Sequence, residues 1–156
     1  KNKSTTSLIK RAENDWLKHF NLPFGDFKNS DIYIEAANQW EYNVKNMHVI
    51  ASNAGAKYFV FLQPTLGLFP NQIPTNKNSN DYKIMEKKSD TYYQNLNRLY
   101  SQLIPRCKKL EFCIDISSEV TPEGNVYNDP RHHNENGNNK LGQLIFENLE
   151  YYLEKN

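Results

Sequence analysis

The sequence has no long apolar run, almost no imbalance of charge and few cysteines. Its longest apolar run, residues 58–62, is far too short to span a bilayer. Nineteen basic and eighteen acidic residues leave a formal net charge of +1, which argues against a dedicated nucleic-acid surface. With 156 residues, 38% of them hydrophobic and 13% aromatic, the chain is predicted to be a soluble protein with a single domain over residues 1–156.

The two cysteines are Cys107 and Cys113, six residues apart. This spacing allows a local disulfide if the protein is exported, or two unpaired thiols if it is cytosolic. Residues 1–7 are polar and lack the apolar core of a signal peptide, so this segment carries no readable export address. The sequence leaves the compartment open.

Apolar residues recur at helical spacing in four stretches of the chain. Gly55 is expected to cap the second helix and Pro105 to stop the third, because proline cannot continue a helix. The predicted helices cover residues 7–19, 32–54, 81–104 and 141–153.

Two short stretches are predicted to be strands. Residues 57–63 read KYFVFLQ, and such unbroken hydrophobicity is typical of a parallel strand covered on both faces. Residues 110–116 instead alternate: Leu110, Phe112, Ile114 and Ile116 are apolar, and the residues between them are Glu111, Cys113 and Asp115, a pattern that also predicts a strand. Because a buried parallel sheet normally needs four or more strands, we expect further strands upstream or from another chain.

The loop at residues 126–137 reads VYNDPRHHNENG and lies between the second strand and the last helix. In open α/β sheets, ligands bind at the carboxyl ends of strands, so a site is expected here. Asp129 and His132 are close enough for the carboxylate to accept the imidazole Nδ1–H, which would raise the basicity of Nε2. The pattern predicts an acid–base pair for nucleophilic acyl transfer.

The same loop resembles the C-terminal block of the SGNH/GDSL-type serine ester hydrolases, an Asp-x-x-His sequence followed by Asn and Gly-Asn. The residues in this register are Asp129, His132, Asn134, Gly137 and Asn138. The resemblance extends over residues 38–153. It implies a three-layer α/β/α sandwich with a parallel sheet of flavodoxin-like type, in which the N-terminal strands are missing from this segment. It also implies that Asp129 orients His132 and that His132 is the general base and acid.

The serine nucleophile implied by the resemblance has no counterpart in the sequence. Residues 24–27 read FGDF, with phenylalanine in place of the serine of a Gly-Asp-Ser block. Residues 12–15, AEND, faintly resemble the family's Gly-x-Asn-Asp block, but they fall within a predicted amphipathic helix and we interpret the likeness as coincidence. Ser117 and Ser118 follow a strand but lack the glycine-bounded turn that exposes a nucleophile.

Other interpretations of the polar residues are weaker. Asp129, His132, His133 and Glu135 include metal-ligand types, yet adjacent histidines rarely converge on one ion. We therefore expect no metal and no cofactor. His133 is predicted to face solvent or the rim of the site, and His48 and His19 are predicted to be structural.

The sequence thus favours hydrolysis of a carboxylic ester, an O-acyl or acetyl group on a carbohydrate or lipid, with the serine supplied from outside this segment. The alternative is a non-catalytic α/β binding module, a degenerate or split homologue. Expected partners are a small-molecule or carbohydrate ester and a complementary N-terminal segment or chain. Nucleic acid and a membrane span are not expected.

Overall fold

The computed structural model describes residues 31–122 and 125–154, and every structural statement below concerns these residues. The helix predicted at residues 7–19 lies outside the described residues, as do the segments 12–15 and 24–27 and the residue His19. No helix in the described ranges is long and apolar enough to cross a membrane.

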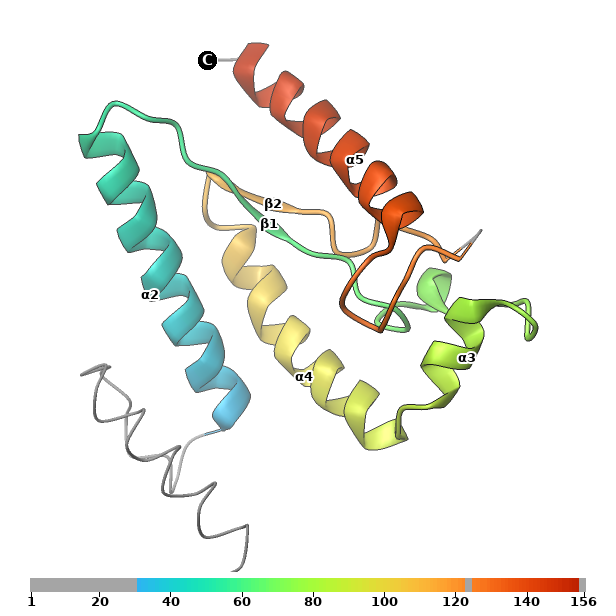
Figure 1. The fold of residues 1–156 in the computed structure, drawn as a ribbon. Coiled ribbons are helices and arrows are strands. Elements are labelled where there is room, and N and C mark those ends of the chain that lie inside the picture. Colours follow the sequence, from blue (N-terminus) through green and yellow to red (C-terminus); the bar gives the residue numbers. More distant parts are fainter. Residues whose placement is uncertain (1–30, 123–124, 155–156) are drawn as a thin grey trace, which may run out of the picture.

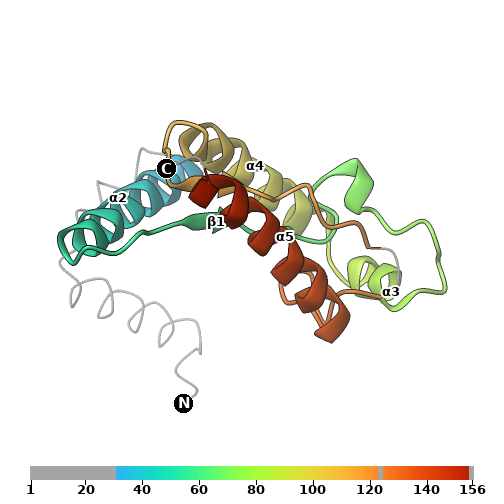
Figure 2. The same ribbon diagram turned by 90° about the horizontal axis from the view of Figure 1, so that it is seen from above.

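In residues 31–122 and 125–154 the fold is mixed α/β, with four α-helices and a small parallel sheet of two strands. β1 pairs with β2 in the register Val60↔Cys113. Figures 1 and 2 show α2 and α4 side by side on one face of the strand pair and α5 on the other. The elements, in chain order, are α2 (Ile32–Asn53), β1 (Val60–Leu62), the 3₁₀ turn η1 (Pro70–Gln72), α3 (Asn80–Glu86), α4 (Asp90–Cys107), β2 (Cys113–Asp115) and α5 (Glu135–Glu154).

Alternation along β1 explains why helices cover both faces of the strand pair. Val60 and Leu62 pack into a core cluster with Leu103 of α4 and Ala37 of α2. Phe59, one residue before the strand, points the other way and contacts Tyr152 of α5, with ring centroids 5.9 Å apart. The prediction of a parallel strand packed against helices is therefore confirmed, although Val60 and Phe61 are only half-buried and both strands are shorter than predicted.

The prediction of a single helix at residues 81–104 was wrong in two respects. The chain breaks it into α3 and α4, because the Ser89 hydroxyl accepts a hydrogen bond from Tyr92 N at 3.3 Å and starts a new helix. Pro105 does not stop α4, which continues to Cys107. The last turn persists because Leu103 and Cys107 are buried in the core cluster.

The ends of α2 and α5 follow local capping chemistry. The Asp31 carboxylate accepts from Tyr33 N at 2.9 Å at the start of α2, and Gly55 adopts a φ of 72° after its end, as predicted. α5 begins six residues before the predicted apolar stripe, at Glu135 rather than at residue 141. Its first turns are polar, so hydrophobic periodicity could not reveal them.

A second core cluster lies under the loop predicted to carry the site. Its buried members come from the segment after β1, from α3 and from the loop that follows β2: Leu66, Ile84, Val120, Val126 and Tyr127. Leu144 of α5 packs against this cluster. The loop therefore has an apolar foundation of its own, separate from the helix-covered strand pair.

Candidate acid–base site

Asp129 and His132 come together as the sequence predicted. His132 Nδ1 lies 2.7 Å from Asp129 Oδ2. The other carboxylate oxygen, Oδ1, accepts hydrogen bonds from the backbone N–H of Arg131 at 2.9 Å and of His132 at 3.0 Å. We call residues 129–132 the acid–base turn. The turn lies at the carboxyl end of β1, because the side chain of Gln63 donates from Nε2 to the carbonyl oxygen of Arg131.

These contacts fix the charge of Asp129 and, with it, the ring nitrogen of His132 that donates to the carboxylate. The hydrogen bond from the Arg131 N–H, followed by that from the His132 side chain, lowers the pKa of Asp129 from 3.8 to about 2. The carboxylate is therefore ionised at neutral pH and can only accept hydrogen bonds. The proton between the two side chains belongs to His132 Nδ1, which leaves Nε2 as the basic nitrogen. With 78% of the His132 side chain exposed, this ring is accessible from solvent.

A short antiparallel pairing supports the acid–base turn. Tyr127 and His133 form a bridge. Asn128 N donates to the carbonyl oxygen of His132 at 2.8 Å. Because neighbouring residues on such a backbone point to opposite sides, His132 faces outward and His133 inward. The prediction that His133 faces solvent or the rim of the site was wrong: only 7% of it is exposed, and its ring centroid lies 4.6 Å from that of Tyr127.

Asn134 and Gly137 have structural roles in the motif. The Asn134 side chain accepts from Gly137 N at 3.1 Å and so caps the start of α5. A Cβ atom on Gly137 would lie 2.1 Å from the carbonyl oxygen of Val126 and 2.8 Å from His133 Cβ. Only glycine lets the helix approach the loop this closely.

Asp81 is a buried residue of this region that the sequence did not single out. Its Oδ2 accepts from Val126 N at 2.9 Å and its Oδ1 from Tyr127 N at 3.0 Å. The carboxylate is fully buried and joins α3 to the start of the loop. The only signal in the sequence was an acidic residue in the first turn of a helix, which is too common to identify such a contact.

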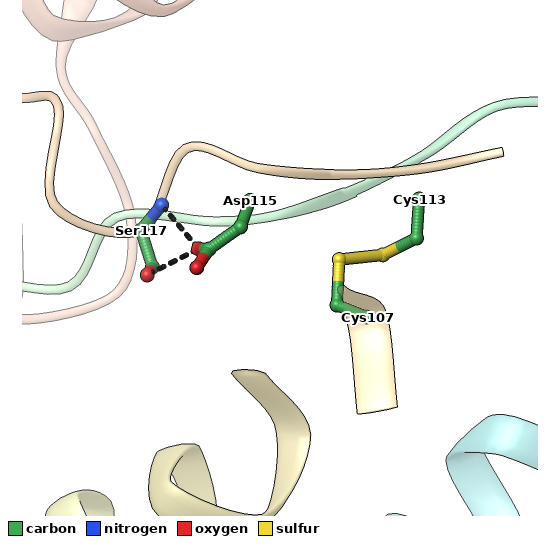
Figure 3. Close-up of a disulfide and its surroundings, with 4 residues drawn as sticks. All are labelled: Cys107, Cys113, Asp115 and Ser117. Carbon is green, nitrogen blue, oxygen red and sulfur yellow. Dashed lines mark hydrogen bonds between the residues drawn. A yellow bond between two sulfur atoms is a disulfide. The ribbon is translucent and has the colours of Figure 1, made fainter. Parts of the chain in front are cut away.

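The residues that follow β2 are structural. Figure 3 shows the Ser117 hydroxyl and backbone N–H directed at the Asp115 carboxylate, at 2.5 and 3.1 Å. Ser117 is only 1% exposed, which fits the prediction that it is no nucleophile. Cys107 and Cys113 form a disulfide, with a sulfur–sulfur distance of 2.02 Å, so the two thiols are paired with each other. His48 is stacked on Phe112 at 4.1 Å between centroids.

A cavity of about 290 Å³ adjoins the acid–base turn. Apolar side chains of α4 form one wall, and polar groups from the end of β1 and from the turn form the other. The lining residues are Gln63, Thr65, Leu96, Leu99, Tyr100, Leu103, Arg131 and His132. In the described part of the chain, no three His, Cys, Asp or Glu side chains are grouped so that they could hold a metal ion.

No protein-family model, curated protein or solved structure matches this sequence. The interpretation of the site therefore depends on the geometry of the acid–base turn and on the residues of its motif.

Proposed function

We propose that this chain carries the acid–base part of a serine ester hydrolase. The substrate is a carboxylic ester, an O-acyl or acetyl group on a carbohydrate or lipid, and the serine comes from outside this chain segment. One observation carries the proposal, namely the 2.7 Å contact that fixes an ionised Asp129 on the Nδ1–H of an accessible His132. This is the arrangement that a serine requires from its base.

In the proposed reaction, His132 Nε2 takes the proton of the serine hydroxyl as its oxygen attacks the ester carbonyl. His132 then gives this proton to the departing alcohol, and the acyl group remains on the serine. Next it takes a proton from water, whose oxygen attacks the acyl carbonyl, and returns the proton to the serine as the acid leaves. Asp129 holds the ring orientation and stabilises the imidazolium formed in each step.

The arrangement of helices supports the fold that this proposal requires. Two parallel strands with α2 and α4 on one face and α5 on the other fit part of a three-layer α/β/α sandwich of the SGNH type. A complementary segment would add the remaining strands to this pair. It would also bring the serine and the donors of an oxyanion hole to the same sheet edge.

A second candidate is a non-catalytic α/β module that binds a ligand or partner. The observation that favours it is the absence of serine from the cavity wall beside His132 within the described ranges. Ser117, the first of the two serines that follow β2, is buried and hydrogen-bonded to Asp115.

A fluorophosphonate, which labels activated serines covalently, distinguishes the two candidates by intact-mass spectrometry. The hydrolase predicts a labelled species, either a heavier chain that contains this sequence or a second polypeptide bound to it. Labelling should be lost in His132→Ala, whose stability hardly changes because the side chain is exposed. It should persist in the control His48→Gln, on α2. A single unlabelled species of 18.3 kDa would favour the binding module.

A further inference from the structure

The segment that follows β1 is tied to the acid–base turn by two hydrogen bonds. The backbone N–H of Leu66 donates to the carbonyl oxygen of Pro130 at 2.9 Å. The side-chain amide of Gln63 donates to the carbonyl oxygen of Arg131. The first bond is made by the backbone and is independent of side-chain identity, whereas the second depends on an amide donor at residue 63.

The two bonded peptide units are the same ones that hold the carboxylate. The Pro130 carbonyl belongs to the peptide unit whose N–H, on Arg131, donates to Asp129 Oδ1 at 2.9 Å. The Arg131 carbonyl belongs to the next unit, whose N–H, on His132, donates to the same oxygen at 3.0 Å. Because a peptide unit is planar and trans, a donor that fixes its C=O direction also fixes its N–H direction.

We propose that Gln63 is a positioning residue that aligns Asp129 with His132 by orienting the peptide unit between residues 131 and 132. The Asp129 and His132 side chains are exposed, and a hydrogen bond between side chains in water is too weak to hold a loop in one geometry. Their alignment must therefore come from the backbone. The hydrogen bond on the carbonyl also polarises the peptide unit and strengthens its N–H as a donor. The catalytic meaning of this role rests on the function proposed above.

Tyr100 of α4 fixes the backbone at Gln63. Its hydroxyl donates to the backbone carbonyl of Gln63 at 2.7 Å and lies 3.2 Å from the hydroxyl of Thr65. Burial raises the pKa of Tyr100 above its ordinary value of 10.0, so the hydroxyl keeps its proton at neutral pH. The backbone from which the Gln63 side chain reaches the turn is thus fixed to a helix.

The test is Gln63→Met, which keeps the length of the side chain and removes the donor. We expect the pKa of Asp129, followed by carbon NMR of its carboxyl group in the 156-residue chain, to rise from about 2 part of the way toward 3.8, because the bond from the Arg131 N–H, the largest cause of the lowered pKa, remains. The matched control is Gln143→Met, which removes another exposed glutamine donor, one that bonds Glu147 at 2.8 Å in α5. The control should leave the pKa of Asp129 unchanged, and urea unfolding should show both variants folded.

An unchanged pKa of Asp129 in folded Gln63→Met would overturn the positioning role. This readout needs no serine, so it is separate from the test of the hydrolase. If fluorophosphonate labels the wild-type assembly, Gln63→Met should slow the labelling up to about 100-fold. If nothing is labelled but the pKa rises, the hydrolase proposal fails and the positioning of Asp129 by Gln63 stands.

Discussion

At the scale of single residues, burial separates two adjacent histidines. The side chain of His132 is exposed and paired with Asp129, whereas His133 is buried against Tyr127. The Nε2 atom of His133 is buried and has no hydrogen-bond partner among the described residues. Burial lowers the pKa of His133 below its ordinary value of 6.5; the Asp81 carboxylate opposes this shift and His132 adds to it.

This lowered pKa predicts a loss of stability in acid. Below about pH 6.5, His133 is protonated in the unfolded chain but stays neutral in the folded chain until the pH falls below its lowered pKa. The free energy of unfolding therefore decreases as the pH drops through this range. The fall from this source ends below the folded pKa. Between about pH 8 and about pH 5, the urea midpoint should therefore decrease less in His133→Phe than in the wild type. Equal decreases in the two proteins would rule out this source.

At the scale of elements, the entry of α5 is fixed by its contact with the loop. Gly137 lies against the carbonyl oxygen of Val126, whereas Gly142, five residues further along the helix, has no atom within 4 Å of the position of a Cβ. The two glycines therefore share a helix and differ in their surroundings.

This difference predicts opposite effects of one substitution. Gly137→Ala should lower the free energy of unfolding by about 2 kcal/mol, because the backbone of the loop must move to admit the methyl group. Gly142→Ala should raise it by about 0.5 to 1 kcal/mol, because alanine is the better helix former. Urea unfolding of both variants checks the pair. Similar values for the two would show that the contact at Gly137 is not tight.

At the scale of the whole molecule, two core clusters stabilise different parts of the structure. One packs α2 and α4 against the strand pair and contains the Cys107–Cys113 disulfide. The other lies under the loop, where the Asp81 carboxylate holds the backbone of Val126 and Tyr127. The fold is stabilised in the first cluster, and the site is supported by the second.

Reduction of the disulfide should therefore weaken the fold and leave the site intact. The small loop closed by Cys107 and Cys113 predicts a loss of about 2 kcal/mol in the free energy of unfolding when dithiothreitol is added. The carboxyl titration of Asp129 in the reduced, folded chain should match that of the oxidised chain. A double Cys107→Ser, Cys113→Ser variant should show no response to the reductant. A changed titration would show that the two clusters are coupled.

The sequence by itself determined the elements that depend on local pattern. The apolar stripe and Gly55 located α2, and the unbroken run before Gln63 predicted a strand covered on both faces. The spacing of Asp129 and His132 predicted their contact, because three residues along a turn keep the imidazole within reach of the carboxylate. Such features are set by residues close together in the chain.

The tertiary structure decided what depends on residues far apart in the chain. The burial of Cys107 in a core cluster with Leu62 of β1 extended α4 past Pro105, where proline predicted its end. His133 points inward because it packs against Gly137 and the ring of Tyr127. Gln63 can donate to Arg131 only because β1 ends beside the loop. Burial and hydrogen bonding across the chain have no period along the sequence, so only the folded arrangement could reveal them.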